Sequence, residues 1–327
     1  MLDHVRIENF KSIRAAEFDA QRVNVFIGEP NAGKSNVLEA LSLLSKEAMI
    51  RPADFVRFNS PADLFFDQNL SNVVSICASN WKCTIRFDGN SFLGRFGDEG
   101  QSGSSDLGAE FQWDRLGTAV KTLVRSGKFE HRIRSYQFDR MATFPNAQPG
   151  ELNPPFGDNL VAVLAGNAEL RKQIGTIFRA KGFRLQIQQM GGELLIAKET
   201  GEELFSFPWN TVSETLRRIV FFLTALETNQ NCTLLFDEPE ANTFPFYTKQ
   251  MAERIALDDR NQYFLTTHNP YLLSALVEKT PIADLAVFVT RMENYETRVQ
   301  RVPDEQLSEL LELGVDTFFN LGRLVPE

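Results

Sequence analysis

The chain has 327 residues, of which 43% are hydrophobic, and its formal net charge is −9. This length allows one large domain or two, and the apolar share is enough for a sizeable core. The acidic balance argues against a protein coated in phosphate-binding charge, although it leaves room for a local basic groove. No run approaches the roughly 18 apolar residues of a membrane span, and the first residues do not read as a signal peptide. We therefore expect a cytoplasmic protein.

The cysteines and histidines point to neither a disulfide framework nor an obvious metal site. The three cysteines form no C-x-x-C pair, which favours reduced thiols. The three histidines are scattered along the chain.

The first residues predict strands that lead into a glycine-rich loop. Residues 2–10 alternate apolar and polar side chains, and residues 17–26 are expected to form a second strand that returns to the loop.

Residues 28–35 match the phosphate-binding pattern G-x-x-x-x-G-K-S through Gly28, Gly33, Lys34 and Ser35. Glycines let such a loop turn tightly and aim its N–H groups at phosphate oxygens. Lys34 is expected to reach the β- and γ-phosphates of ATP. The Ser35 hydroxyl is expected to bind Mg²⁺, which prefers oxygen ligands and keeps several from water and phosphate.

The surroundings of this loop support the motif. Residues 23–27 read as a buried strand, and residues 36–45 carry apolar side chains at helical spacing, so the order is strand, loop, helix. The helix N-terminus adds a partial positive charge. Lys11 and Arg14 are either close to the nucleotide or solvated strand charges, and the sequence favours neither reading. The ATP-binding residues expected in the loop are Glu29, Asn31, Ala32, Gly33, Lys34, Ser35 and Asn36.

Residues 51–72 are irregular and contain Gln68. A glutamine in this place reaches Mg²⁺ and the attacking water in one class of ATPases, and the alternative is an ordinary loop residue. Three short strands of a meander are expected at residues 73–78, 81–87 and 91–96, and residues 97–108 read as a flexible Gly/Ser-rich loop.

The middle of the chain predicts a compact insertion or arm without a long coiled coil, because it contains no heptad run. We expect helices at residues 113–124, 159–164 and 168–179, a strand at 131–138, and a hairpin formed by 183–189 and 193–198.

A strong helix is expected from residue 211 to 227, capped by Thr211 or Ser213. The apolar strand at residues 233–236 then ends in Asp237 and Glu238. Two acids in this position form the second half of a nucleotide site: Asp237 holds the Mg²⁺ shell and Glu238 polarises the attacking water.

His268 ends a further buried strand at residues 262–267. Parallel α/β sheets bind ligands at the carboxyl ends of their strands, so we expect His268 at the γ-phosphate. The structural alternative is a satisfied histidine at a strand end.

The order of NFKSI, GEPNAGKSN, a serine-led helix, TLLFDEPEAN and FLTTHNPYLL resembles the ABC-type ATPases of the SMC/RecF group. Within this group it is most similar to the stand-alone AAA-family ATPases related to the OLD proteins, many of which serve in bacterial anti-phage systems. The resemblance covers residues 1–96 and 205–290. It implies an α/β fold: an ABC-type P-loop NTPase core with a mixed sheet, interrupted by a smaller α+β insertion.

The resemblance also implies roles for single residues. Lys34 and Ser35 correspond to Walker A, whereas Asp237 and Glu238 correspond to Walker B. The remaining correspondences are Gln68 with the Q-loop, His268 with the switch histidine, and Ser213 with the signature serine that binds the ATP of the opposite subunit.

Glu214 and Thr215 depart from this pattern, because they stand where the signature has glycines. A glutamate near a γ-phosphate is repelled, which argues against a tight two-ATP sandwich.

These patterns together predict an ATPase core split into residues 1–96 and 205–327, with an insertion at 97–204. The expected function is Mg²⁺-dependent ATP hydrolysis that drives or gates self-assembly, in the sensor or motor half of an anti-phage system. Only residues 291–327 follow the last core strand, too few for the TOPRIM nuclease of OLD proteins, so we expect a separately encoded effector such as a nuclease or toxin. The alternatives are a RecF-like DNA repair ATPase and a nucleotide-gated scaffold that hydrolyses ATP very slowly.

Overall fold

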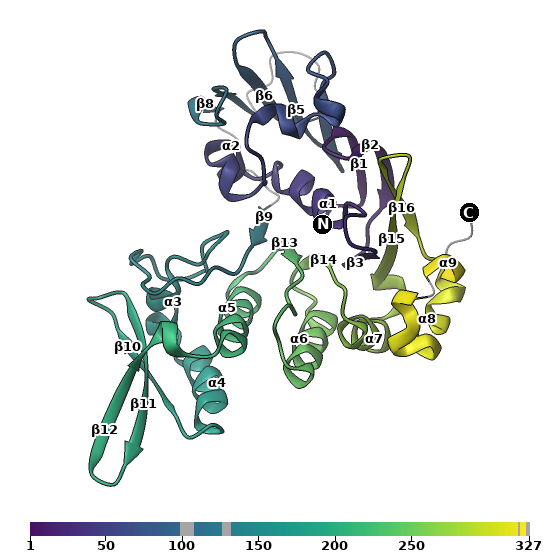
Figure 1. Ribbon diagram of the computed structural model, residues 1–327. Coiled ribbons are helices and arrows are strands. Elements are labelled where there is room, and N and C mark those ends of the chain that lie inside the picture. Colours follow the sequence, from purple (N-terminus) through teal and green to yellow (C-terminus); the bar gives the residue numbers. More distant parts are fainter. Residues whose placement is uncertain (99–107, 126–131, 320, 325–327) are drawn as a thin grey trace. The chain divides into compact units, whose positions relative to one another are not determined.

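Two units, each with its own interior, make up the chain in the computed structural model (Figure 1). The model describes residues 1–98, 108–125, 132–319 and 321–324. The first unit comprises 1–135, 231–238 and 255–327, and the second comprises 136–230 and 239–254. The expected insertion at 97–204 remains a prediction about the family core, since these units are defined by compactness alone.

An antiparallel sheet of seven strands in the order β2-β1-β4-β5-β6-β7-β8 forms one half of the first unit. Its strands are β1 His4–Phe10, β2 Ile13–Asp19, β4 Val74–Ala78, β5 Trp81–Phe87, β6 Phe92–Asp98, β7 Gly108–Trp113 and β8 Ala119–Arg125. The expected meander is thereby confirmed.

Two sequence predictions for this region are wrong. The helix expected at residues 113–124 is the end of β7, a turn and β8. Gly117 adopts a φ of 84° in that turn, where Asp114 accepts its N–H at 3.1 Å. The single strand expected at 17–26 is two strands in different sheets, because the chain turns between Asp19 and Val23.

The second sheet of this unit has the order β16-β15-β3-β14-β13-β9. Its central strands β15, β3, β14 and β13 are parallel, and β16 is antiparallel to β15, so the sheet is mixed as expected. The bounds are β3 Val23–Gly28, β9 Arg132–Tyr136, β13 Cys232–Asp237, β14 Gln262–Thr266, β15 Leu285–Glu293 and β16 Glu296–Arg301.

Helix α1 Lys34–Ser42 contacts strands of both sheets and fills the core between them. Val37, Leu38 and Leu41 on this helix pack with Phe26 and Phe288, whose rings stack at 4.9 Å. This packing fixes the end of α1 that follows the glycine-rich loop. The other helices of the unit are α2 Lys46–Ile50, the last residues of α6 Pro245–Leu257, α7 Pro270–Lys279, α8 Leu307–Leu313 and α9 Leu321–Leu324.

The second unit combines helices with a small sheet of its own. It contains α3 Leu160–Gly166, α4 Ala168–Arg179, α5 Glu214–Thr228 and most of α6, together with β10 Arg184–Gln188, β11 Glu193–Thr200 and β12 Glu203–Pro208. The two expected helices and the hairpin are confirmed, whereas β12 was not expected. No coiled coil leaves the described part of the chain, whose longest helix has 15 residues.

None of the helices within the structure's described ranges is long and apolar enough to cross a membrane. The expected flexible loop at residues 97–108 lies almost entirely outside the described residues.

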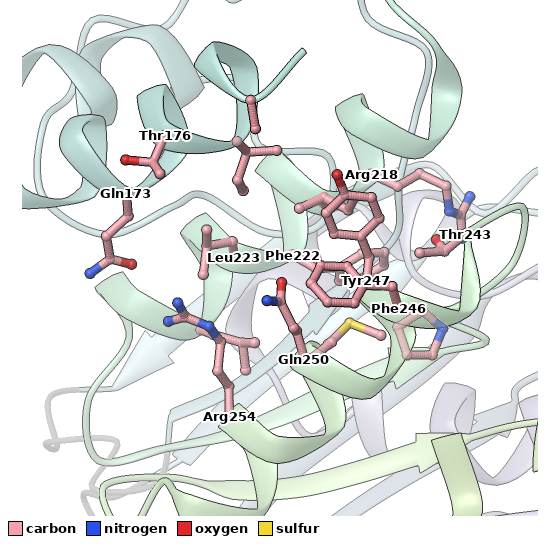
Figure 2. Close-up of a pocket in the computed structure, with 16 residues that line it drawn as sticks. Gln173, Thr176, Arg218, Phe222, Leu223, Thr243, Phe246, Tyr247, Gln250 and Arg254 are labelled. Carbon is pink, nitrogen blue, oxygen red and sulfur yellow. The ribbon is translucent and has the colours of Figure 1, made fainter. Parts of the chain in front are cut away.

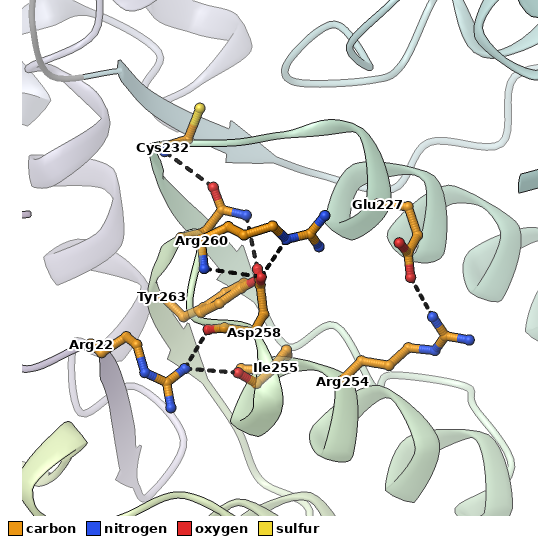
Figure 3. A network of polar contacts seen from close by, with 9 residues as sticks. Arg22, Glu227, Cys232, Arg254, Ile255, Asp258, Arg260 and Tyr263 are labelled. Carbon is orange, nitrogen blue, oxygen red and sulfur yellow. Dashed lines mark hydrogen bonds and ion pairs between the residues drawn. The ribbon is translucent and has the colours of Figure 1, made fainter. Parts of the chain in front are cut away.

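Arg22 ties the start of β3 to the end of α6 (Figure 3). Its guanidinium donates to the backbone oxygens of Ile255 at 3.2 Å, Ala256 at 2.7 Å and Asp258 at 2.6 Å, and it pairs with Asp284 at 3.2 Å. These carbonyls end a helix and lack helical partners. Arg22 therefore satisfies them and anchors the strand that enters the loop.

We expect Arg22→Ala to lower the free energy of unfolding by about 2–3 kcal/mol, because several bonds to one buried charge are lost together. The matched control is Arg14→Ala, which removes an exposed ion pair with Glu296 and should cost less than about 1 kcal/mol. Thermal unfolding of both variants tests this. Equal shifts in Tm would show that the Arg22 contacts do not stabilise the fold.

Candidate functional site

The loop between β3 and α1 has the backbone that a phosphate-binding turn requires. Gly33 adopts a φ of 91° and Asn31 a φ of 62°. A Cβ atom on Gly33 would lie 2.0 Å from Thr297 Oγ1, and one on Gly28 would lie 2.3 Å from the Thr290 oxygen. Only glycine fits at either position, because β15 and β16 press directly against the loop.

Lys34 lies folded against the loop that precedes it. Its ammonium donates to the backbone oxygens of Gly28 and Glu29, both at 2.9 Å, and the residue is 5% exposed. Burial lowers the pKa of Lys34, and the carboxylates of Glu238 and Asp237 oppose that shift. The two acids of β13 therefore act on the same ammonium electrostatically.

Asp237 is held by hydroxyl groups from two other elements. Ser35 Oγ donates to Asp237 Oδ1 at 3.0 Å, and Thr266 Oγ1 donates to the same oxygen at 2.5 Å. Thr266 Oγ1 also accepts the N–H of Glu238 at 2.9 Å. The structure thus brings together Ser35, Asp237 and Glu238, three of the residues named from the sequence.

Glu238 and His268 form a pair. Their side chains meet at 3.0 Å between Glu238 Oε1 and His268 Nε2. Glu238 adopts a φ of 44°, an uncommon backbone conformation for glutamate that is often found at functional sites. Burial, followed by the positive charge of Lys34, lowers the pKa of His268, whereas Glu238 and Asp237 oppose this shift. His268 is therefore neutral near pH 7 and donates its N–H to the carboxylate.

Lys11 lies beside a second cation that sequence reasoning missed. Lys11 and Arg57 both bind the buried carboxylate of Glu39 on α1, Arg57 through Nε at 2.5 Å. Burial lowers the pKa of Lys11 despite the attraction of Glu39. Burial opposes the charge of Arg57, but the charge and hydrogen bond of Glu39 raise its pKa, and the charges of Asp237 and Glu238 add to this rise. Arg57 therefore interacts electrostatically with Asp237 and Glu238.

Gln68 makes a different contact from the one expected of it. Its side-chain amide donates to Asp63 Oδ1 at 2.8 Å, and both residues line an open hollow with Lys11 and Arg57. The structure joins Gln68 to this hollow rather than to Ser35, so its part in a magnesium site stays a prediction.

Ser213 lies in the second unit, whereas the glycine-rich loop belongs to the first. It caps α5: its Oγ accepts the N–H of Leu216 at 3.4 Å. Glu214 binds Asn242 at 3.0 Å and Arg140 at 2.6 Å, and these contacts lower its pKa, the hydrogen bond from Asn242 foremost. Thr215 donates to the Asn242 oxygen at 2.7 Å. Glu214 and Thr215 therefore bind the segment that follows Asp237 and Glu238 in sequence.

The other loop residues either face solvent or stabilise the loop. Glu29 and Asn31 are exposed, and Ala32 is buried. Asn36 donates to Ser12 Oγ at 2.7 Å, and Ser12 shares a second 2.7 Å bond with Thr297. Ser12 belongs to the NFKSI segment noted in the sequence, but its partners come from far along the chain.

This donor set fits ATP and Mg²⁺. The loop presents a helix N-terminus, a buried ammonium and a serine hydroxyl, which suit the phosphates of a nucleotide. Within the described residues, no group of three His, Cys, Asp or Glu side chains could hold a metal ion. Ser35 and Asp237 would supply only part of a magnesium shell, and phosphate and water oxygens are the usual remainder.

Comparisons with known proteins agree with this geometry. Residues 1–110 match the AAA ATPase domain family. No curated protein sequence matches the chain. Among solved structures, the chain is similar to an SMC head bound to the C-winged helix domain of ScpA, with a TM-score of 0.54, 14% identity, and coverage of 94% of this chain and 99% of that one.

Two further SMC heads are similar at lower scores. One is from Thermotoga maritima, with a TM-score of 0.42, 12% identity and coverage of 92% and 99%. The other, bound to the C-terminal domain of ScpA derived from Pyrococcus furiosus, has a TM-score of 0.48, 13% identity and coverage of 95% and 98%. The SMC head likeness at 0.54 and the AAA match confirm the expected resemblance: the chain has an SMC/RecF-like ABC-type ATPase fold.

We expect His4 and His268 to titrate on opposite sides of the ordinary pKa of 6.5. The hydrogen bond to Asp19, followed by that to Glu17, raises the pKa of His4. His4 therefore stabilises the fold below pH 6.5, and this stabilisation is lost as the pH rises through its raised pKa. The pKa of His268 is lowered, so its stabilising contribution is fully present above pH 6.5 and is lost as the pH falls from 6.5 through its lowered pKa.

Proton NMR of the histidine rings measures both values, and His4→Gln and His268→Gln assign the signals. A His268 that titrates above 6.5 would contradict the arrangement around Glu238 and Lys34.

Proposed function

We propose that this SMC/RecF-like ATPase fold binds ATP with Mg²⁺ and hydrolyses it. The observation that carries the proposal is the 3.0 Å bond between Ser35 and Asp237, which lie 202 residues apart. It joins the phosphate loop to the acid that corresponds to Walker B. AAA ATPase domain similarity over residues 1–110 supports the same activity.

Each side chain has one task in this proposal. Lys34 neutralises phosphate charge, and Ser35 and Asp237 hold the magnesium shell. Bound Mg²⁺ would supply Lewis-acid stabilisation of the phosphate charge. Glu238 accepts a proton from the attacking water, and the N–H of His268 holds the carboxylate in position.

We further propose that ATP gates the association of two copies through Ser213. The objection from Glu214 is weaker than the sequence suggested, because Arg140 and Asn242 compensate its carboxylate. A compensated carboxylate repels a phosphate less than an isolated one.

The wider role that we propose is the sensor or motor of an anti-phage system with a separate effector. It rests on resemblance to OLD-related ATPases. The SMC head of the similar structure is bound to a domain of another protein, which supports a partner of some kind. Assembly with a co-expressed candidate nuclease or toxin, measured with and without ATP, tests this role.

A DNA-dependent ATPase is the second candidate. Arg86, Arg95 and Lys121 line a hollow on the seven-stranded sheet, where a phosphate backbone could bind despite the acidic net charge. Glu110 lines it as well and pairs with Arg95 at 3.1 Å, so the hollow is basic by two charges. ATP turnover that rises severalfold with DNA and falls in Arg86→Gln would favour this candidate.

We expect Lys34→Ala to weaken ATP binding by about a hundredfold or more, because charge-assisted bonds to phosphate are lost. Isothermal titration calorimetry measures the affinity, and circular dichroism checks the fold. Lys46→Ala, which also removes a lysine near α1, is the control. Wild-type affinity in Lys34→Ala would refute the phosphate-loop assignment.

We expect Glu238→Gln to bind ATP normally and to hydrolyse it about 10² to 10⁴ times more slowly, since general-base loss has that cost. Glu278→Gln, an exposed change on α7, should keep wild-type turnover. Phosphate release measures the rate. An unchanged rate in Glu238→Gln would remove this residue from the catalytic role.

The Glu238→Gln variant should also accumulate as a dimer with ATP and Mg²⁺. Adding Ser213→Arg should abolish the dimer while ATP binding persists. The larger, positively charged arginine side chain would block the surface that meets the second copy. Ser206→Arg, on the exposed strand β12, is the control. Light scattering measures the mass, and a dimer that persists in Ser213→Arg would leave Ser213 as a helix cap alone.

A further inference from the structure

A cavity of about 430 Å³ lies wholly within the second unit, and none of the proposed ATP-site residues lines it (Figure 2). Its walls come from α4, α5 and the segment from Pro239 to Arg254. This volume falls in the range of small-molecule sites, which is roughly 300–1,000 Å³. The cavity is therefore large enough for a compact organic ligand.

Apolar side chains make up most of the lining. Three of them are aromatic, and the rings of Phe246 and Tyr247 meet edge to face at 5.3 Å. Figure 2 shows these rings together with Phe222 on one side of the cavity. Aromatic rings prefer offset or edge-to-face neighbours, so an aromatic ligand suits this wall. The other apolar residues of the lining are Ile177, Ala180, Ile219, Leu223, Leu226, Pro239 and Met251.

The charged groups of the lining are all positive. Arg218 and Arg254 line the cavity, and no Asp or Glu does, although the whole chain has a net charge of −9. The Arg218 guanidinium lies 5.8 Å from the Phe222 ring. Figure 2 places Arg254 apart from Arg218, beyond Gln250. Each guanidinium also pairs with an acid outside the lining, Arg254 with Glu227 and Arg218 with Glu214 at 3.9 Å. A ligand with a negative group therefore finds a guanidinium on either side and shares it with that acid.

Gln173 adds a polar feature to the wall formed by α4. Its Oε1 is buried and has no hydrogen-bond partner among the described residues. A buried acceptor without a partner costs free energy, which a ligand N–H or O–H would recover once the amide turns toward the cavity. The lining thus specifies an apolar ring system, a negative group and a hydrogen-bond donor.

We propose that this cavity is a regulatory binding site for a small aromatic organic acid that carries a hydrogen-bond donor. Two of its walls connect in sequence to residues of the proposed ATP site: Pro239 follows Glu238 directly, and α5 begins immediately after Ser213. A ligand that binds one arrangement of these walls more tightly than another would shift the population toward that arrangement. The regulatory part rests on the proposed ATPase function, whereas the binding part does not.

Two probes that differ in one group test the binding part. 8-Anilinonaphthalene-1-sulfonate has an aromatic body, an N–H donor and a sulfonate, and N-phenyl-1-naphthylamine lacks only the sulfonate. In nucleotide-free fluorescence titrations, the sulfonate probe should bind at one site per chain. Its affinity should be at least about tenfold higher than that of the neutral probe, because the sulfonate forms charge-assisted hydrogen bonds with arginine.

Variants locate this binding. The double variant Arg218→Gln/Arg254→Gln should lose the preference for the sulfonate. Arg184→Gln, which removes an exposed ion pair with Glu199 in the same unit, should keep it. Ile219→Trp fills the cavity and should abolish binding. Thr176→Trp also narrows the cavity, but from an exposed position that tolerates a large side chain. It replaces Ile219→Trp in this test if Ile219→Trp does not fold.

Different results would overturn the binding part and the regulatory part of the proposal. Equal affinity for the two probes, or unchanged binding in Thr176→Trp, would overturn the binding site. Bound sulfonate probe should also change ATP turnover at least about twofold in the wild type but not in Thr176→Trp. Unchanged turnover would overturn the regulatory part. A wild-type chain without any ATPase activity would overturn the proposed function and the regulation that rests on it, but not the cavity's binding.

Discussion

The hydroxyl of Thr266 is the contact on which the arrangement of the acids depends. It is fully buried at the end of β14, donates to Asp237 and accepts the N–H of Glu238. Asp237 and Thr266 face each other in the parallel register of β13 and β14. One buried side chain thus fixes both acids, and it holds Glu238 in a backbone conformation that a glutamate seldom adopts. Removing such a hydroxyl leaves a buried N–H without its partner, which is costly.

Threonines also shape the opposite side of the site. Thr290 on β15 and Thr297 on β16 leave no room for a Cβ on Gly28 or Gly33. Thr297 also shares a hydrogen bond with Ser12, and the Ser12 hydroxyl accepts a hydrogen bond from Asn36 on α1. The loop is therefore shaped by its glycines and by the strands beside it, and the antiparallel edge strand β16 is part of the scaffold of the proposed nucleotide site.

The sequence predicted those parts of the site that are local in the chain. The G-x-x-x-x-G-K-S spacing and the apolar strand ending in Asp237 and Glu238 each sit on one strand end, where short patterns are informative. Thr266 and Arg57 were missed, because a threonine in a strand and an arginine in an irregular segment carry no distinctive local signal. Thr266 meets Asp237 through the register of two strands, and Arg57 meets Glu39 on α1. Only the folded chain brings these residues together. The helix expected at 113–124 failed for the same reason: residues 119–125 pair with β7, and this pairing overrides the local pattern.

The central claim is that the phosphate loop and the β13 acids form one metal–nucleotide site. Electron paramagnetic resonance with Mn²⁺ in place of Mg²⁺ tests it directly, because ³¹P coupling reports a phosphate bound to the metal. The account predicts that Mn²⁺ and ATP together give a protein-bound signal with ³¹P coupling in the wild type. It predicts that Ser35→Ala and Asp237→Ala each weaken this protein-bound signal, since these residues supply the protein's share of the shell. A protein-bound manganese signal with the same strength and ³¹P coupling in both variants would contradict it.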